Sequence, residues 1–285
     1  MVEKKPLVSV IIPNFNYSNY LGQTIESVLA QTYDNIEILV VDDGSTDNSI
    51  EVAKQYSNKI RLICQSNGGV SSARNEGIRN SRGSFVCFLD ADDFWERNKL
   101  ELQMNRALET NSGLIYSGYL ECDANLSVIR EILPVFQGYC ESFYRRKPGS
   151  AIALLGTSTA LIRRDVIDLV GTFDTTLNTS ADWDYLRRVS KFTDFAFVPS
   201  PLVRYRRHGS NMSSGSLVKY YQDNENAVIK MVSEYSNFTL ENFILNRHSI
   251  FRFHFGAGCA FMKTKDFRLG LRYFCKAISG IMSFS

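Results

Sequence analysis

The stretch IEILVVDDGSTDNSIEVAKQY, residues 36–56, holds one strand, one turn and one helix, and it sets the fold class. Its first six residues, Ile36–Val41, form a short apolar run typical of a strand that is buried on both faces. The polar letters DDGS follow directly. Asp47–Tyr56 then reads as a helix, with Ser45 or Thr46 as its candidate N-cap. The stretch therefore predicts a strand–turn–helix unit with its polar residues at the end of the strand.

The same unit recurs along the first third of the chain. Three more short apolar runs occur, at Leu7–Ile12, Ile60–Cys64 and Phe85–Leu89. Helix-like stretches separate them, at Tyr20–Gln31 and Gly69–Ser81. Strands that alternate with helices indicate an open parallel sheet with right-handed crossovers. Such sheets bind their ligands beyond the carboxyl ends of the strands.

The remaining two thirds are patterned less regularly. We expect a helix over Asn98–Asn111 and then a strand within Gly113–Cys122. A loop or small insertion over Asp123–Ser158, which contains YRRKPGS (Tyr144–Ser150), should follow. After it we expect a strand over Thr159–Ile162, a helix over Asp182–Lys191, and helices from Leu217 onward.

The composition excludes several classes of protein. The 285 residues are 44% hydrophobic and 22% charged, as in ordinary soluble globular proteins, and a net charge of +2 gives no reason to expect nucleic acid as a partner. The six cysteines show no paired spacing, which indicates a reducing compartment. The apolar run between Pro6 and Pro13 is too short for a signal peptide or a membrane span. We therefore expect a cytoplasmic protein, with contact at the inner face of the cell membrane left open.

Each of the four expected strands ends in polar residues. The ends read PNFN (residues 13–16), DDGS (42–45), QSNGG (65–69) and DADD (90–93). At one edge of a sheet they would form a crevice suited to a nucleotide with its metal. The close carboxylates Asp90, Asp92 and Asp93 repel one another unless a cation lies among them. They indicate either a polar strand end with a capping Asp or a divalent-metal site, and these residues alone leave both open.

Six blocks in this order resemble the family 2 glycosyltransferases: SVIIPNFN, VDDGSTDNS, NGGVSSARNEGI, FLDADDFW, SADWDYLRR and YRRHGSNMS. The resemblance covers roughly Leu7 to Ser214. It implies the GT-A fold, an α/β architecture with a Rossmann-like, mostly parallel sheet and flanking helices. The expected domain is 1–214, with a nucleotide-binding half (about 1–111) and an acceptor half (about 112–214). A helical extension over 215–285 follows.

The resemblance also implies an activity. It is that of an inverting, metal-dependent glycosyltransferase that moves a sugar from a UDP- or dTDP-linked donor to a hydroxyl of a glycan or lipid-linked glycan. The expected setting is the synthesis of bacterial cell-surface polysaccharide or glycolipid. Two other functions stay open: a sugar-1-phosphate nucleotidyltransferase and a non-catalytic nucleotide-sugar binding module. P-loop and dinucleotide-binding proteins are disfavoured, because the chain lacks G-x-x-x-x-G-K-[ST] and G-x-G-x-x-G.

Site residues follow from the matching blocks. Phe15 would offer its ring to the base, and Asp43 would accept a hydrogen bond from the base imide. Mn²⁺ or Mg²⁺ would be held by Asp92 and His208, since carboxylate and imidazole suit these ions, with Asp90 at the ribose or a metal-bound water. Arg206 or Arg207 would lie near phosphate. The residues expected at the nucleotide sugar are Pro13, Phe15, Asn16, Asp43, Asn67, Gly68, Arg74, Asp90 and Asp92.

The catalytic base falls in SADWDYLRR. The family usually has Glu-Asp there, and the Asp deprotonates the acceptor hydroxyl. This chain has Ala181 and then Asp182, so Asp182 takes the role of base and the preceding carboxylate is missing. Asp184 is expected as an acid in the first turn of the helix, and Trp183 either lines the acceptor pocket or packs in the core.

The C-terminal segment is basic and amphipathic. From Arg247 to Ser285 there are seven Lys or Arg and one acid, Asp266. An apolar face is predicted to contain Phe267, Leu271, Phe274, Ile278 and Ile281, with Arg268, Arg272 and Lys276 elsewhere. We expect this face to pack internally or in a homodimer, with contact at an anionic membrane surface as the alternative.

Overall fold

The computed structural model describes residues 5–140, 156–209, 211, 216–234 and 240–282. The chain divides into two compact units, and the described residues through Asn211 belong to the first. The second contains the C-terminal helices. The expected domain limits, 1–214 and 215–285, and the two halves expected within the first domain stay a prediction. Among the described helices, none is both long enough and apolar enough to cross a membrane.

The N-terminal half of the sheet is parallel, as the sequence predicts. β1 (Val8–Asn14) lies between β2 (Ile36–Asp42) and β4 (Phe85–Phe88), and β3 (Arg61–Cys64) is the outer neighbour of β2. Every residue of β1 is buried. The expectation of burial on both faces is wrong for β3, whose first and last residues are exposed because it forms the edge of the sheet.

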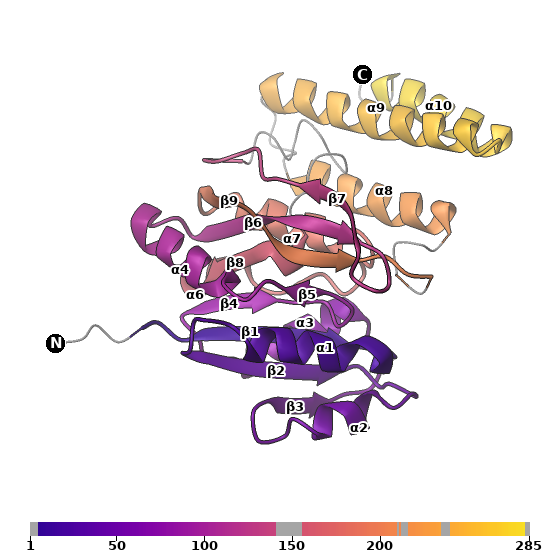
Figure 1. The fold of residues 1–285 in the computed structure, drawn as a ribbon. Coiled ribbons are helices and arrows are strands. Elements are labelled where there is room, and N and C mark those ends of the chain that lie inside the picture. Colours follow the sequence, from indigo (N-terminus) through magenta and orange to yellow (C-terminus); the bar gives the residue numbers. More distant parts are fainter. Residues whose placement is uncertain (1–4, 141–155, 210, 212–215, 235–239, 283–285) are drawn as a thin grey trace. The chain divides into compact units, whose positions relative to one another are not determined.

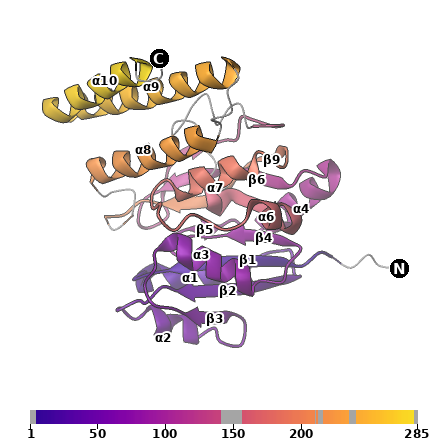
Figure 2. The ribbon, with the colours of Figure 1, turned by 180° about the vertical axis from the view of Figure 1, so that it is seen from behind.

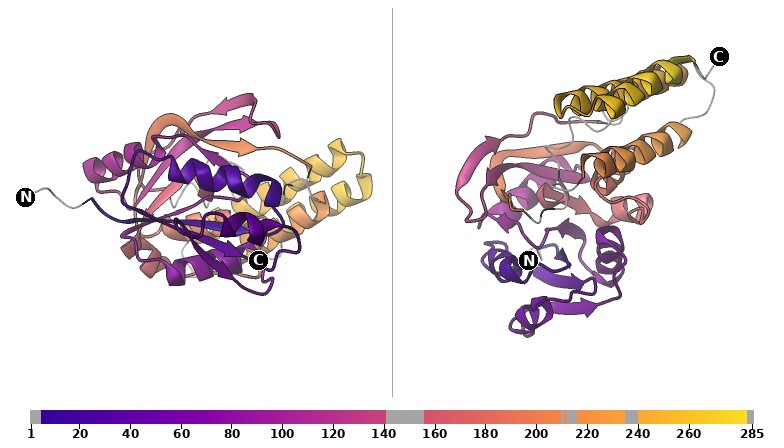
Figure 3. Two further views of the ribbon diagram at one scale, coloured as in Figure 1. Left: turned by 60° about the horizontal axis from the view of Figure 1, so that its bottom comes forward. Right: turned by 90° about the vertical axis from the view of Figure 1, so that its right-hand side faces the viewer.

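Three helices connect these strands: α1 (Ser18–Leu29), α2 (Ser49–Lys54) and α3 (Val70–Asn80). α1 lies on the face of the sheet that is turned to the viewer in Figure 1. α3 lies on the opposite face, which is turned to the viewer in Figure 2, and the right-hand view of Figure 3 shows the sheet nearly edge-on. Apolar residues at helical spacing turn α1 towards the core: Leu21, Ile25 and Val28.

The second half of the sheet is mixed. β8 (Ala160–Arg163) is antiparallel to β4, and β6 (Leu114–Cys122) is antiparallel to β8. β9 (Phe195–Arg206) runs parallel to β6, and the two-residue strand β5 (Phe94–Trp95) is antiparallel to β9. β7 (Val128–Ile132) pairs with the far end of β6. The order is β3-β2-β1-β4-β8-β6-β9-β5, and the α/β class is confirmed.

Further helices of the first unit lie between these strands. They are α4 (Lys99–Thr110), the 3₁₀ turn η2 (Thr157–Thr159), α6 (Arg164–Val170) and α7 (Ala181–Val189). α4 and α7 agree with the two helices expected from the sequence. The main core is built from β1, β2, β4, α1 and α4, with fully buried Trp95 and Leu161 joining the second half of the sheet to it.

Three strands were missed, and the two-residue β5 is the shortest of them. β7 lies where the sequence predicts a loop or insertion over Asp123–Ser158, and residues 141–155 of that stretch, including YRRKPGS, fall outside the described residues. β9 runs through Pro199 and Pro201, which lack a donor for the ladder. Its pairing with β6 shifts register between Ser117 and Tyr119, so the bulge accommodates the prolines.

The predicted cap of the second helix is also wrong. The N-cap is Asn48, whose side chain makes no capping hydrogen bond. Asp47, one residue earlier, accepts a hydrogen bond on Oδ1 from the backbone N–H of Ser49 (3.0 Å). Its Oδ2 accepts from the backbone N–H of Ser18 (2.9 Å), so one carboxylate holds the starts of α1 and α2. Ser45 instead accepts a hydrogen bond from the backbone N–H of Asn16 (2.9 Å).

The described part of the second unit contains three helices: α8 (Leu217–Glu234), α9 (Leu240–Lys263) and α10 (Phe267–Met282). The prediction that the chain is helical from Leu217 is confirmed for its described residues. α9 and α10 run side by side (Figure 3). The Tyr221 ring on α8 contacts the rings of Phe253, Phe261 and Tyr273, with centroids 5.3–6.1 Å apart.

Candidate active site

Arg74 joins the fourth strand end to the start of α7. Its Nη2 donates to Asp90 Oδ1 (2.8 Å), and its Nη1 donates to Asp182 Oδ1 (2.5 Å). The Arg74 side chain is 3% exposed, while Asp90 and Asp182 keep 38% and 30% of their side-chain surface. One buried guanidinium therefore holds two accessible carboxylates that are far apart in the sequence.

Asp182 is held from its other side by the 3₁₀ turn. Its Oδ2 accepts hydrogen bonds from Thr157 Oγ1 (3.0 Å) and from the Thr157 backbone N–H (3.3 Å). Thr157 is fully buried. The carboxylate is thus fixed in position but still reachable from solvent, as a general base must be.

The acidic loop after β4 disfavours negative charge. Burial raises the pKa of Asp93 well above its usual range, and repulsion from Asp92 and Asp90 adds to that. Burial raises the pKa of Asp92 too, although His208 opposes the shift. For Asp90 the loss of solvent outweighs the opposing effect of Arg74 and raises the pKa. A cation bound here would relieve this penalty.

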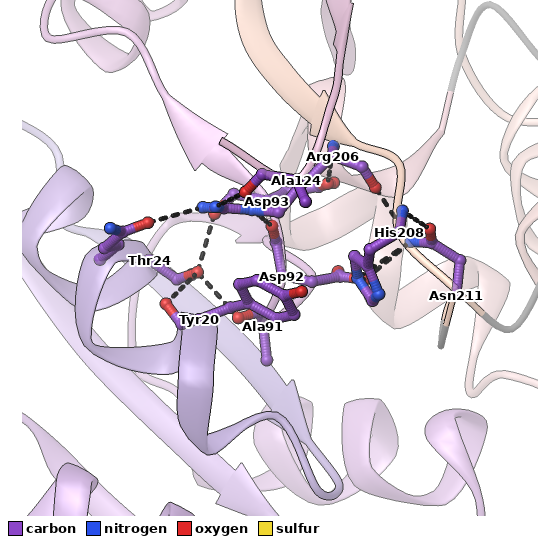
Figure 4. A network of polar contacts seen from close by, with 10 residues as sticks. Tyr20, Thr24, Ala91, Asp92, Asp93, Ala124, Arg206, His208 and Asn211 are labelled. Atoms are coloured by element: carbon purple, nitrogen blue, oxygen red, sulfur yellow. Dashed lines mark hydrogen bonds and ion pairs between the residues drawn. The ribbon is translucent and has the colours of Figure 1, made fainter. Parts of the chain in front are cut away.

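Asp92 and His208 point towards each other (Figure 4). His208 Nε2 lies 3.0 Å from Asp92 Oδ2, and Asn211 Nδ2 donates to the same oxygen (3.0 Å). The side chains of both Asp92 and His208 are largely buried. Tyr20 packs against the His208 ring with centroids 4.6 Å apart. The structure thus brings the two predicted metal ligands together from segments 116 residues apart.

These donors fit a divalent ion that also binds a ligand. Mg²⁺ and Mn²⁺ accept carboxylate and imidazole ligands and are commonly completed by substrate phosphates. The described residues contain no group of three or more His, Cys, Asp or Glu side chains that could hold an ion by themselves. Asp92 and His208 can therefore supply two ligands, and a phosphorylated ligand would have to supply others.

Arg206 supports the acidic loop through hydrogen bonds to its backbone and to Asp93. Its Nε donates to the Asp92 carbonyl (2.8 Å), and its backbone N–H donates to Asp93 Oδ1 (3.2 Å) (Figure 4). Its Nη1 and Nη2 donate to the Ala124 carbonyl and to Gln23 Oε1. These contacts give Arg206 a supporting role in the loop, and its expected place near phosphate stays a prediction. Asp93 receives the Arg206 N–H here and does not cap a following turn.

Arg207 is a surface residue. Its Nη1 pairs with Glu121 (2.7 Å), and its side chain is mostly exposed. The structure gives no second contact that would place it at the acidic loop.

The ends of β1 and β2 are bound together. Asn14 Nδ2 donates to Asp42 Oδ1 (2.8 Å) and to Ser45 Oγ (3.1 Å). Asn16, at a positive φ of 60°, accepts the backbone N–H of Thr46 on its Oδ1 (2.8 Å). Asn16 thus secures the neighbouring loop with its amide oxygen, and Asp42 Oδ2 accepts the backbone N–H of Ser45 in the same loop (3.0 Å).

Asp43 braces the glycine loop. Its Oδ1 accepts from Gln65 Nε2 (2.6 Å) and from the Gly68 N–H (2.9 Å), and its Oδ2 accepts from the Gly69 N–H (2.8 Å). Gly69 adopts φ +85°, which favours glycine. Asp43 is buried, so any contact with a base would use its remaining acceptor capacity.

The other residues predicted to contact the nucleotide sugar differ in their exposure to solvent. Phe15 is 41% exposed and can offer its ring to a base, and Asn67 and Gly68 are also exposed. Pro13 is a buried residue of β1, opposite Val41, so it shapes the strand end from within.

The residues at the start of α7 differ in burial, and Asp182 is flanked by buried neighbours. Asp184 is fully buried and pairs with Arg187 and Arg188, both at 2.9 Å. Trp183 and Ala181 are buried as well, so Ala181 contributes no polar group at the position where the family usually has Glu. Asp182 is the accessible acid in this first turn.

Sequence reasoning missed Thr157 and Asn211. Thr157 lies in a stretch without periodicity, and its contact with Asp182 depends on the turn that precedes β8. Asn211 lies in the HGSN part of YRRHGSNMS, and its position three residues after His208 was the available signal.

The described fold is that of a GT-A glycosyltransferase. S. aureus TarS 1–349 in complex with UDP-GlcNAc has a TM-score of 0.64 at 18% identity, over 96% of this chain and 92% of that one. The mannosyltransferase PcManGT from Pyrobaculum calidifontis, in complex with GDP-Man and Mn²⁺, has a TM-score of 0.65 at 17% identity, over 98% and 75%. At such identities the likeness shows the fold alone.

Sequence comparison then gives the family. The family described as glycosyl transferase family 2 matches residues 9–171. The uncharacterized glycosyltransferase RP339 of Rickettsia prowazekii is 31% identical over 238 residues, 80% of this chain and 73% of the relative. An uncharacterized glycosyltransferase of Rickettsia felis is 36% identical over 73% of this chain, which spans only 35% of that relative's length. The chain belongs to glycosyl transferase family 2.

Proposed function

We propose that the protein is an inverting, metal-dependent glycosyltransferase that moves a sugar from a UDP- or dTDP-linked donor to a hydroxyl acceptor. The observation that carries this proposal is the Arg74 bridge between Asp90 and Asp182. It holds a carboxylate of the acidic loop and an accessible carboxylate at a helix start on one guanidinium. That arrangement suits a reaction in which donor and acceptor meet between the two.

The donor would lie along the ends of β1 to β4. Phe15 would stack on the base, and Asn16 and Asp43 would keep the β1 and β2 loops in shape around it. Asn67 and Gly68 would line the glycine loop, with Pro13 behind it. Asp90 and Asp92 would face the sugar diphosphate. These roles agree with the exposure of Phe15, Asn67 and Asp90 and assign supporting roles to the buried residues.

Asp182 would act as the general base. Inversion at the anomeric carbon requires the acceptor hydroxyl to be deprotonated opposite the leaving group. Thr157 and Arg74 would orient the Asp182 carboxylate, and the proton would pass from the acceptor oxygen to it. A divalent ion, Mn²⁺ or Mg²⁺, on Asp92 and His208 would supply neutralisation of the charge on the departing diphosphate.

The wider setting is proposed from the relatives. The S. aureus TarS structure contains UDP-GlcNAc and the PcManGT structure contains GDP-Man with Mn²⁺, which supports a nucleotide-sugar donor with a metal here. We place the acceptor among glycans or lipid-linked glycans of bacterial cell-surface polysaccharide or glycolipid synthesis. The missing carboxylate at Ala181 favours the non-catalytic binding module as the second candidate.

The test measures release of nucleoside diphosphate. The purified chain is incubated with UDP-, dTDP- and GDP-sugars and Mn²⁺, with Asp92→Ala and Asp182→Asn alongside. We expect slow donor hydrolysis that requires Asp92 and that Asp182→Asn strongly reduces. Release of pyrophosphate from a nucleoside triphosphate and a sugar 1-phosphate would instead establish the nucleotidyltransferase. Tight donor binding without turnover across a panel of acceptors would establish the binding module.

A further inference from the structure

The predicted apolar face of α10 is not the face that packs. The buried residues of α10 are Gly270, Tyr273 and Ala277. Tyr273 stacks on Phe261 of α9, with centroids 5.3 Å apart. Met262 of α9 lies so close to Gly270 that an added Cβ would approach its sulfur to 2.7 Å. The expectation that the face containing Phe267 and Leu271 packs internally is therefore wrong for the described residues.

That face is left open. Phe267, Leu271 and Ile278 are 57%, 59% and 59% exposed, and their spacings of four and seven residues place them on one side of α10. Phe274 lies on the same side and contacts Phe255 of α9, with centroids 5.3 Å apart.

The open face continues onto α9. Phe255 is itself 48% exposed and stacks on Phe251, with centroids 5.6 Å apart. Apolar side chains from both helices thus form one surface, which we call the hairpin face: Phe251, Phe255, Phe267, Leu271, Phe274 and Ile278. Isolated exposed apolar residues are ordinary, but a contiguous set of this kind marks a contact surface.

Positive charge surrounds the hairpin face. The exposed cations of this region are Arg252, Lys263, Lys265, Arg268 and Arg272. Between residues 249 and 282 the one acid is Asp266. Arg268 and Arg272 each follow directly after one of the exposed apolar residues of α10. A step of one residue turns the side chain by about 100° around the helix, so these cations lie beside the apolar side and not on it.

We infer that the hairpin face binds the surface of an anionic lipid bilayer. An interfacial helix buries its apolar side at the boundary of headgroups and acyl chains and keeps Lys and Arg at the anionic headgroups. A second copy of this chain fits less well, since a twofold contact through the hairpin face would bring two sets of like charges together. An acidic protein partner would satisfy the cations but would not need aromatic side chains at the centre.

The site on the sheet gives this surface a use. A bilayer that carries lipid-linked glycans would hold the protein where its acceptor is concentrated. This advantage for acceptor binding rests on the proposed function, whereas vesicle binding can be measured without any sugar substrate. Failure of the two proposals is therefore distinguishable.

The experiment is co-sedimentation of the full chain with vesicles. Vesicles of equal parts phosphatidylglycerol and phosphatidylcholine are compared with phosphatidylcholine alone. We expect binding to the anionic vesicles and little to the neutral ones. Leu271→Gln/Ile278→Gln should weaken it at least about tenfold, because two buried side chains are lost from the interface. Arg268→Gln/Arg272→Gln should weaken it and reduce its dependence on salt.

The matched control is Leu108→Gln/Lys59→Gln, which removes an exposed apolar and an exposed basic residue of the first unit. It should bind as the unaltered chain does. Equal binding by the control and the Leu271→Gln/Ile278→Gln chain would overturn the inference, as would equal binding to neutral vesicles. A dimer in solution that dissociates in the Leu271→Gln/Ile278→Gln chain would assign the face to a second copy.

A second measurement reads insertion directly. Both native tryptophans, Trp95 and Trp183, are buried in the first unit, so a Leu271→Trp chain carries one additional exposed reporter. Its emission should shift to the blue with anionic vesicles. No shift at saturating lipid would mean that the apolar face stays in water and would overturn the inference even if the protein sediments.

Discussion

Arg74 holds Asp90 and Asp182 on one buried guanidinium, with N–O distances of 2.8 and 2.5 Å. The two carboxylates come from different halves of the sheet, one after β4 and one at the start of α7. A carboxylate of the acidic loop and the proposed base therefore share a single cationic support, and a change at Arg74 should affect both.

Replacing Arg74 by Lys tests this support. Lys keeps the charge but lacks the planar fork that reaches two carboxylates at once. We expect kcat to fall about 10- to 100-fold, the range for a misplaced catalytic group, with a smaller change in donor affinity. Arg74→Met should also lower the free energy of unfolding by about 1–3 kcal/mol, since buried donors and partners are separated. Steady-state kinetics and thermal melting measure the two effects. A Lys chain with unaltered kcat would remove Arg74 from any positioning role.

Asp182 and Asp184 provide a matched pair two residues apart. Asp182→Asn should reduce turnover about 10²- to 10⁴-fold, as for loss of a general base, and leave donor binding nearly unchanged. It should lower the free energy of unfolding by only about 1 kcal/mol, since Arg74 keeps Asp90 as a partner. Asp184→Asn should instead destabilise the fold by about 3–5 kcal/mol, because it removes the buried carboxylate that pairs with both Arg187 and Arg188. Product release and melting curves separate the outcomes. If both chains lost activity and stability alike, Asp182 would be structural.

The proposed metal dependence predicts an effect at His208. Addition of EDTA should abolish donor turnover, and excess Mn²⁺ should restore it. His208→Ala should raise the Mn²⁺ concentration needed for half-maximal activity about 10- to 100-fold, as seen when a metal site loses a supporting group. His254→Gln is the control, because that histidine belongs to the helical unit. Activity that is indifferent to EDTA, or an equal shift in both chains, would contradict the prediction.

Phe15 should act through its exposed ring. Phe15→Ala should weaken donor binding by about 1–3 kcal/mol, the value of stacking a base on an aromatic ring. It should have little effect on melting, since much of the ring is already in water. Phe192→Ala removes another exposed ring and serves as the control. Titration calorimetry with UDP and dTDP measures both, and equal affinities would show that Phe15 does not contact the base.

The helical unit contains an acid-sensitive set of hydrogen bonds centred on Glu225, which we call the Glu225 tie. Glu225 on α8 accepts hydrogen bonds on Oε1 from His254 on α9 (3.1 Å) and Lys276 on α10 (2.6 Å). These partners lower the pKa of Glu225 to about 2, chiefly through the His254 hydrogen bond, against the opposing effect of burial. Because the pKa is lowered on folding, the stabilisation is complete above about pH 4.5 and is lost as pH falls towards 2.

Glu225→Gln isolates this tie. At neutral pH we expect a loss of roughly 1–2 kcal/mol, after allowing for solvent screening at the partly exposed Lys276. Thermal melting of both chains between pH 7 and pH 2.5 measures the difference, which should shrink as the pH falls. A difference that stayed constant with pH would show that the Glu225 charge does not stabilise the helices.

The periodicity of the sequence determined the first half of the fold. Continuous apolar runs such as Phe85–Leu89 are typical of strands buried between two layers, and the helices between them bury one stripe. Four parallel strands therefore followed from the local pattern. The hydrophobic pattern was uninformative where pairing with a neighbouring strand decides the conformation. β9 contains Pro199 and Pro201, and only its long alignment with β6 and the bulge there make it a strand.

The sequence by itself also determined which residue types gather at the site, because polar residues at parallel strand ends must share one edge of the sheet. Tertiary structure alone decided what each one does. Asp43 became a brace for the glycine loop, Arg206 a buried support and Thr157 a partner of Asp182, while Phe267, Leu271 and Ile278 were left uncovered. The physical reason is that hydrogen bonds and burial depend on which distant segments meet, and side-chain spacing along one element does not contain that information.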